Sequence, residues 1–327
     1  MASKKRSSPT ARQAQNPKPR SPKLSKSWAE RLKQLTAPAR RNKGLAPYVL
    51  ANIEAIKDML DGKGPDSAER AADAGAHAVA NVAAEHVPAF VSASRRREPN
   101  PYKNGYDLGK YRVGDALPEE EQRKTREIVD LALPVSPPNE IYFCAVELNG
   151  AGIRFYGDLC LVLKASAVPP DTCVLDRNSY DLSRAPISNM TKALPALQGH
   201  QRRVAVAAAW SGSYARDLAD MVAVRTFMFR PPVPRRLTLG QVGEVLLEDE
   251  DYMEVLLRRS FSAYDLLEVR TNATDAAADA AISDRLRRGP FPRIEEVGWR
   301  RARRRAERAL RSVNLRTRIV ASLGRIK

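Results

Sequence analysis

Histidine and cysteine are scarce in this chain, which contains three of each among its 327 residues. Without a Cys-x-x-Cys pair or a second cluster of histidines, the sequence offers no complete ligand set for a zinc ion. The glycine-rich loops GxxxxGKS/T and GxGxxG, the HExxH zinc motif and the GxSxG nucleophile motif are also missing. These absences argue against the enzyme classes that such motifs define.

Long apolar runs are missing as well. No run of about 18 uncharged apolar residues occurs, so the sequence predicts no membrane-spanning helix and no membrane partner. The N-terminus is basic and has no apolar segment behind it, unlike a secretory signal. Cys144, Cys160 and Cys173 are odd in number and lie in apolar surroundings, so we expect three free core thiols and a cytoplasmic location.

Positive charge is concentrated at the two ends of the chain. The formal net charge is +17; residues 1–45 carry +12 and residues 300–327 carry +10, so the segment between them carries −5. A mildly acidic body with two basic ends favours contact with nucleic acid or with an acidic protein. The ends can also serve only to solubilise the chain, and the N-terminal one can be an address that another protein recognises.

The most strand-like part of the chain covers residues 139–182. Residues 140–148 and 153–164 are short apolar runs rich in aromatic and β-branched residues. Asn149-Gly150 between them is a strong hairpin signal, so we predict that the two runs pair as antiparallel strands. Further strands are predicted at residues 224–229, 252–257 and 263–269.

Helices are predicted on both sides of this strand region. They cover residues 28–35, 47–60, 66–90, 118–133, 197–222, 238–246, 271–285 and 293–312. The expected fold is α+β, with a central mixed or antiparallel sheet, an N-terminal helical segment and a basic C-terminal helix. The expected organisation is a disordered basic tail (1–45), a helical segment (46–134), an α+β core domain (135–270) and a basic helical region (271–327).

Polar residues recur every four positions on the alanine-rich helix predicted over residues 66–90: Glu69, Asp73, His77, Asn81 and Glu85. Carboxylate and imidazole groups at this spacing can share a metal ion or a proton. They can equally form the solvated face of a helix. We expect the solvated face, because no second cluster completes a coordination shell.

The last predicted helix is unusually rich in arginine. Trp299, Ala306 and Leu310 are available for packing, and arginines cover most of the remaining surface. This pattern predicts a helix that contacts phosphates through charge, without base readout. The predicted contact residues are Arg300, Arg301, Arg304, Arg305 and Arg308.

The predicted strands resemble a known enzyme family. The segment 155–164, followed by Thr172 and Ser179, resembles the core strands of the ADP-ribosyltransferase superfamily. Residues 253–257, with a further strand behind them, are similar to the strand that carries that superfamily's catalytic glutamate. The resemblance covers residues 139–270.

The resemblance implies an enzyme or effector that transfers ADP-ribose from NAD to a macromolecule. Glu254 would then be catalytic, because a carboxylate against the ribose stabilises the positive charge that develops as the nicotinamide bond breaks. Arg154 would hold an NAD phosphate or ribose. Tyr156 would stack on nicotinamide, and Ser179 or Tyr180 would support the glutamate. The acceptor stays open.

Other interpretations compete with the transferase. Glu254 can be an exposed residue on an edge strand, and Arg154 can point outward from its strand. A non-enzymatic nucleic-acid-binding protein, of phage or mobile-element type, would use the basic ends and keep the sheet as a scaffold. A nuclease would need Glu147, Asp158 and Lys164 around one Mg²⁺ ion.

Overall fold

The structure is a computed structural model, and it describes separate ranges of residues along the chain. The described residues are 25–41, 46–60, 75–105, 107–108, 130, 133–135, 140–179, 210–229, 237–246 and 252–321. Most of the predicted charged helix over residues 118–133 lies outside these ranges. Residues 197–209 of the helix predicted over 197–222 lie outside them as well.

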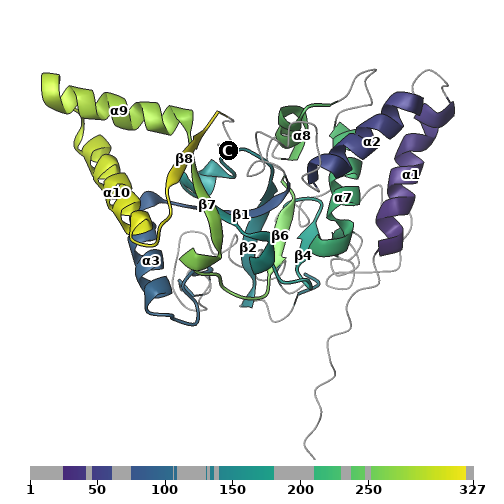
Figure 1. The fold of residues 1–327 in the computed structure, drawn as a ribbon, viewed down its shortest axis with the longest axis horizontal. Helices are drawn as coiled ribbons and strands as arrows, with labels where there is room; N and C mark the ends of the chain where they lie inside the picture. Colours follow the sequence, from purple (N-terminus) through teal and green to yellow (C-terminus); the bar gives the residue numbers. More distant parts are fainter. Residues whose placement is uncertain are drawn as a thin grey trace, which may run out of the picture.

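The fold is α+β, as the sequence predicts, and it is built around one eight-stranded sheet (Figure 1). The strand order is β5-β4-β6-β2-β1-β3-β7-β8. Neighbouring strands are antiparallel except for β7 and β8, which are parallel. The strands are β1 (His77–Val82), β2 (Tyr142–Glu147), β3 (Leu159–Leu163), β4 (Cys173–Leu175), β5 (Ser211–Ser213), β6 (Glu254–Leu257), β7 (Leu266–Asn272) and β8 (Thr317–Val320).

The described helices form two groups at opposite ends of the sheet (Figure 1). One group, beside β4 and β5, consists of α1 (Ser25–Arg41), α2 (Ala46–Leu60), α7 (Tyr214–Phe229) and α8 (Leu239–Leu246). The other, beside β7 and β8, consists of α3 (Val87–Arg95), α9 (Ala273–Arg288) and α10 (Ile294–Arg311). Within the described residues, no helix has the length and apolar character needed to span a membrane.

The alanine-rich segment before residue 90 is a strand, not the predicted helix. Residues 77–82 form β1, which lies between β2 and β3 near the middle of the sheet. Alanine favours helices on its own, but Ala78 and Ala80 are buried here, and small side chains suit a strand that is covered on both faces. His77 and Asn81 therefore do not lie on a solvated helix face, and Asn81 is only 9% exposed.

The predicted hairpin at Asn149-Gly150 is also wrong. Both β2 and β3 pair with β1, so β1 separates the two runs that were expected to pair. The connection between them is long: residues 148–158 run from the end of β2 to the start of β3. Ile153 in this connection is buried in a cluster with Val79 and Val162, so the connection packs on the sheet rather than forming a tight turn.

Residues 224–229 belong to α7 and not to a strand. Val224 and Thr226 are β-branched, but both are buried on α7, where tertiary packing outweighs their preference for strands. The helices predicted near residues 47–60, 271–285 and 293–312 are confirmed as α2, α9 and α10, and β6 confirms the strand near residues 252–257. The short helix after Thr238 is confirmed as α8.

The N-terminal basic segment includes a packed helix. The side chain of Trp28 on α1 is fully buried, and its indole Nε1 donates a hydrogen bond to the Ser211 backbone oxygen at 2.9 Å. The Arg31 guanidinium lies between the rings of Trp28 and Trp210, 4.8 and 4.9 Å from their centroids. The helix predicted over residues 28–35 is therefore confirmed as part of α1, and the disordered tail predicted over 1–45 is wrong for residues 25–41. Residues 1–24 lie outside the described ones.

The predicted domain boundaries do not divide the structure into separate units. β1 comes from the predicted helical segment, and β8 comes from the predicted C-terminal helical region. Both strands join the same sheet as the strands of the predicted core domain.

Cys144, Cys160 and Cys173 are free and buried in this sheet, as expected. Burial raises the pKa of Cys173 to about 12, so its thiol stays protonated at neutral pH.

Candidate functional site

Glu254 and Ser179, two residues of the predicted NAD site, do lie together. Glu254 is on β6 between β4 and β2, so it is not on an edge strand. Its Oε2 accepts a hydrogen bond from the Ser179 backbone N–H at 2.9 Å. The side chain is only 2% exposed and Ser179 is fully buried. The glutamate is therefore supported from the segment that the resemblance indicates, inside the protein rather than in an open cleft.

Arg154 and Tyr156 lie elsewhere. They belong to a 3₁₀ turn, η3 (Arg154–Tyr156), not to a core strand. The Arg154 guanidinium contacts the Asp275 carboxylate in the first turn of α9, at 2.5 and 3.1 Å. Asp275 follows β7, which is four strands from β6 in the order of the sheet. Glu254 thus contacts Ser179, whereas the Arg154 guanidinium contacts Asp275; Tyr180 lies outside the described residues.

The three residues of the nuclease hypothesis have separate partners. Both Glu147 oxygens accept backbone N–H groups, from Leu148 at 2.8 Å and from Gly152 at 3.1 Å. Asp158 is at the other end of the same connection, and Lys164 donates to the Tyr264 backbone oxygen at 2.7 Å. Burial raises the pKa of Glu147, although Arg270 and the backbone N–H groups oppose this effect. Within the described residues, no three acidic, histidine or cysteine side chains form a metal-binding group.

The C-terminal helix α10 begins and ends with well-defined capping contacts. At its start, the Glu296 carboxylate accepts from the Arg293 backbone N–H at 2.8 Å and from Arg285 at 2.6 Å. At its end, Asn314 adopts a left-handed conformation (φ 60°). The backbone N–H of the next residue, Leu315, donates a hydrogen bond to the Leu310 backbone oxygen at 3.0 Å, as in a Schellman motif. These contacts hold an 18-residue helix in one position against the body.

One face of α10 packs on the body, and the opposite face carries the arginines. Arg303, Ala306 and Leu310 are buried, and the Arg303 guanidinium donates to Asp158 at 2.6 Å and to Thr271 at 3.0 Å. Residues four and seven positions apart share a helix face, so the exposed arginines form one stripe. We call it the arginine stripe: Arg301, Arg304, Arg305, Arg308 and Arg311, all exposed.

Acidic neighbours neutralise only part of the arginine stripe. Asp279 on α9 contacts Arg304 at 3.2 Å and Arg300 at 3.5 Å, so Arg300 turns toward α9 and is only 23% exposed. Glu307 contacts Arg304 at 3.5 Å and Arg311 at 3.6 Å. In the part of the chain that the structure describes, Arg301 and Arg305 form no ion pair. The stripe therefore keeps excess positive charge.

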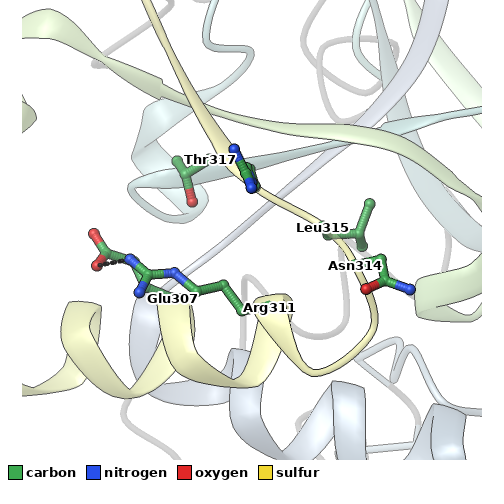
Figure 2. A pocket seen from close by; sticks show the side chains of 6 residues that line it. Glu307, Arg311, Asn314, Leu315 and Thr317 are labelled. Carbon is green, nitrogen blue, oxygen red and sulfur yellow. Dashed lines mark ion pairs between the residues drawn. The ribbon is translucent and has the colours of Figure 1, made fainter.

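A cleft of about 700 Å³ continues this charged surface beyond the end of α10. It is lined by Glu307, Arg311, Asn314, Leu315, Arg316 and Thr317. Figure 2 shows the Arg311 guanidinium and the Thr317 hydroxyl facing the space between α10 and the strand that follows. Thr317 Oγ1 is buried without a hydrogen-bond partner in the described part of the chain. A guanidinium and a free hydroxyl are groups that bind an oxyanion such as a phosphate.

The predicted phosphate-contact residues therefore do not all lie on the exposed face of α10. Arg301, Arg304, Arg305 and Arg308 lie on the exposed stripe, whereas Arg300 is held against α9. Arg316 and Thr317 belong to a cleft that the sequence did not suggest, because the four-residue strand β8 has no apolar alternation to mark it.

Compared with known proteins, the chain matches no family model, no curated protein and no solved structure.

Proposed function

We propose that this protein binds nucleic acid through the arginine stripe of α10, by contacts to phosphates rather than to base edges. The observation that carries the proposal is the stripe itself: five exposed arginines on one face of a capped helix. Among the described residues, Asp279 and Glu307 are the acidic groups that pair with them. From Arg301 to Arg311 the stripe is about 15 Å long, which matches roughly four phosphates of one strand.

The salt dependence of binding tests the proposal. Affinity for a duplex oligonucleotide of arbitrary sequence falls as salt rises, because each neutralised phosphate releases counterions. A variant with Arg301, Arg305 and Arg308 replaced by glutamine binds more weakly, and the slope of log affinity against log salt drops by about 3. Sequence changes in the duplex have little effect on either protein.

The matched control removes the same charge from the other end of the sheet. Lys33 on α1, Lys57 on α2 and Arg216 on α7 are replaced by glutamine, which lowers the net charge by the same three units. The control keeps the parent affinity and slope if α10 is the contact surface. Equal losses in both triple variants would mean that net charge alone drives the binding, and would overturn the proposal.

One contact favours a second candidate function, ADP-ribose transfer from NAD. The Ser179 backbone N–H donates to Glu254, and such a contact would hold the carboxylate in place against a ribose. Slow NAD hydrolysis by the purified protein, abolished in Glu254→Gln with the fold intact, would support this candidate. The low exposure of Glu254 and the engagement of Arg154 with Asp275 make it the weaker of the two.

A further inference from the structure

The turn η3 presents two exposed aromatic side chains. Phe155 is 68% exposed and Tyr156 is 56% exposed. Their rings form an edge-to-face pair with centroids 5.2 Å apart. Large apolar side chains at such exposure are unremarkable one by one, but a neighbouring pair on a single turn forms a surface that can stack on a flat partner.

The Asn81 side chain fixes the position of this turn. Its Nδ2 donates to the backbone oxygens of Ala151 at 2.9 Å and Gly157 at 3.0 Å. Its Oδ1 accepts from the backbone N–H of Ile153 at 2.7 Å. Gly157 lies so close to β1 that a Cβ atom there would be 2.0 Å from the backbone carbon of Val82. One buried side chain therefore holds the backbone on both sides of the aromatic pair.

Two buried charged residues fix the start of the same connection. Glu147 accepts hydrogen bonds from Leu148 and Gly152. Arg270 on β7 is fully buried and donates to the backbone oxygens of Leu148 at 2.9 Å and Gly150 at 3.2 Å. The connection is thus held by three buried polar side chains, including Asn81, from three strands. The aromatic pair pays little conformational entropy on binding, because its backbone is already ordered.

The turn that carries the aromatic pair is connected to the arginine stripe through α9. Arg154, next to Phe155, contacts Asp275 on α9, and Asp279 one helical turn later contacts Arg304 of the stripe. Residues four apart on a helix are about 6 Å apart at their Cβ atoms. The same connection also contacts α10 directly, since Asp158, two residues after Tyr156, pairs with Arg303 on the inward face of that helix. A strand bound at Arg304 can therefore continue over the first turns of α9 toward η3.

We infer that Phe155 and Tyr156 form a stacking platform for unpaired bases, so that the preferred ligand is single-stranded nucleic acid. Exposed aromatic rings next to a track of arginines are the combination that binds single strands without sequence preference, because every base has a face on which a ring can stack. Paired bases in a duplex are already stacked and cannot reach the rings. The inference rests on the proposed function of the arginine stripe and adds the class of nucleic acid.

The test compares single-stranded and duplex probes. The double variant Phe155→Ala/Tyr156→Ala is expected to lose about fivefold or more in affinity for a fifteen-nucleotide oligothymidine, and to keep the parent affinity for a duplex of the same length. Tyr264→Ala is the matched control, because Tyr264 is 55% exposed and lies in the turn η6 (Ala263–Asp265), at the end of β3 opposite η3. It keeps the parent affinity for both probes.

Photocrosslinking gives a second measurement that does not depend on a variant. An oligonucleotide containing 5-iodouracil, irradiated in complex with the parent protein, is expected to form an adduct on the peptide that contains Phe155 and Tyr156. Adducts confined to other peptides, or equal single-strand affinities of the double variant and Tyr264→Ala, overturn the stacking platform. Failure of the arginine stripe is distinct: the glutamine variant of α10 would then bind both probes as the parent does.

Discussion

Arginines inside the sheet and arginines on α10 share a chemistry but have opposite surroundings. Arg270 is fully buried, and its guanidinium donates to Glu268 at 2.6 Å and to the oxygens of Leu148 and Gly150. Arg305 is exposed and has no ion pair with the described residues. A buried guanidinium is tolerated only when protein groups replace its water, so Arg270 stabilises structure. An exposed one remains available to a phosphate.

The largest expected effect is the loss of the buried guanidinium. Arg270→Met leaves Glu268 with Arg318 as its remaining partner and removes the donors to two buried backbone oxygens. We expect the free energy of unfolding to fall by about 3–5 kcal/mol in urea titration. Arg305→Met, on the arginine stripe, is the control and is expected to stay within about 0.5 kcal/mol of the parent. Equal effects of the two variants would contradict the division between buried and exposed arginines.

Arg303 tests the boundary between the two regions, because it lies on α10 but faces inward. Its side chain is 5% exposed and contacts Asp158 and Thr271. Arg303→Met is expected to cost about 2 kcal/mol of unfolding free energy, since Asp158 loses a charged partner but keeps the Ala84 N–H. Nucleic-acid affinity at fixed salt is expected to change little while the protein is folded. A large loss of affinity with unchanged stability would place Arg303 in the binding surface instead.

A single exposed arginine gives a smaller but specific change. Arg305→Gln is expected to leave the free energy of unfolding within about 0.5 kcal/mol of the parent. In titrations of oligonucleotide binding at several salt concentrations, the slope against log salt should fall by about 1. An unchanged slope would show that Arg305 does not contact a phosphate.

The smallest expected effect concerns pH and the start of α10. Hydrogen bonds from Arg285 and from the Arg293 backbone lower the pKa of Glu296 below its ordinary value of 4.5. A group whose pKa is lower in the folded state stabilises that state above its unfolded pKa, and the contribution is lost as pH falls below it. Between about pH 5 and about pH 3, the free energy of unfolding is therefore expected to fall less in Glu296→Gln than in the parent. Urea titrations at each pH measure this difference. Parallel curves for the two proteins would contradict this role.

Helix boundaries near the C-terminus were predictable because local signals are strong there. α9 and α10 are long, separated by a proline-rich break, and α10 has an apolar side that alternates with arginines. The central strand β1 was not predictable, because its alanines favour a helix until both faces are covered by neighbouring strands. The hairpin predicted at Asn149-Gly150 does not form, because β1, which is far from these residues in the sequence, lies between β2 and β3.

The candidate site also has one part that the sequence predicts and one part that depends on tertiary contacts. The stripe residues Arg301, Arg304, Arg305 and Arg308 follow from helical spacing, but the inward turn of Arg300 depends on Asp279 of α9. The neighbourhood of Phe155, Tyr156 and the stripe depends on contacts across three segments, and no local pattern marks it.

The amino-acid sequence by itself determined the α+β class, the basic ends and the arginine-rich helix, because composition and helical periodicity are local properties. The tertiary structure decided which arginines are buried and which are exposed, where β1 inserts, and that an aromatic turn lies beside α10. Those outcomes depend on packing between distant segments, where burial changes the energetic cost of each charge and outweighs local preference.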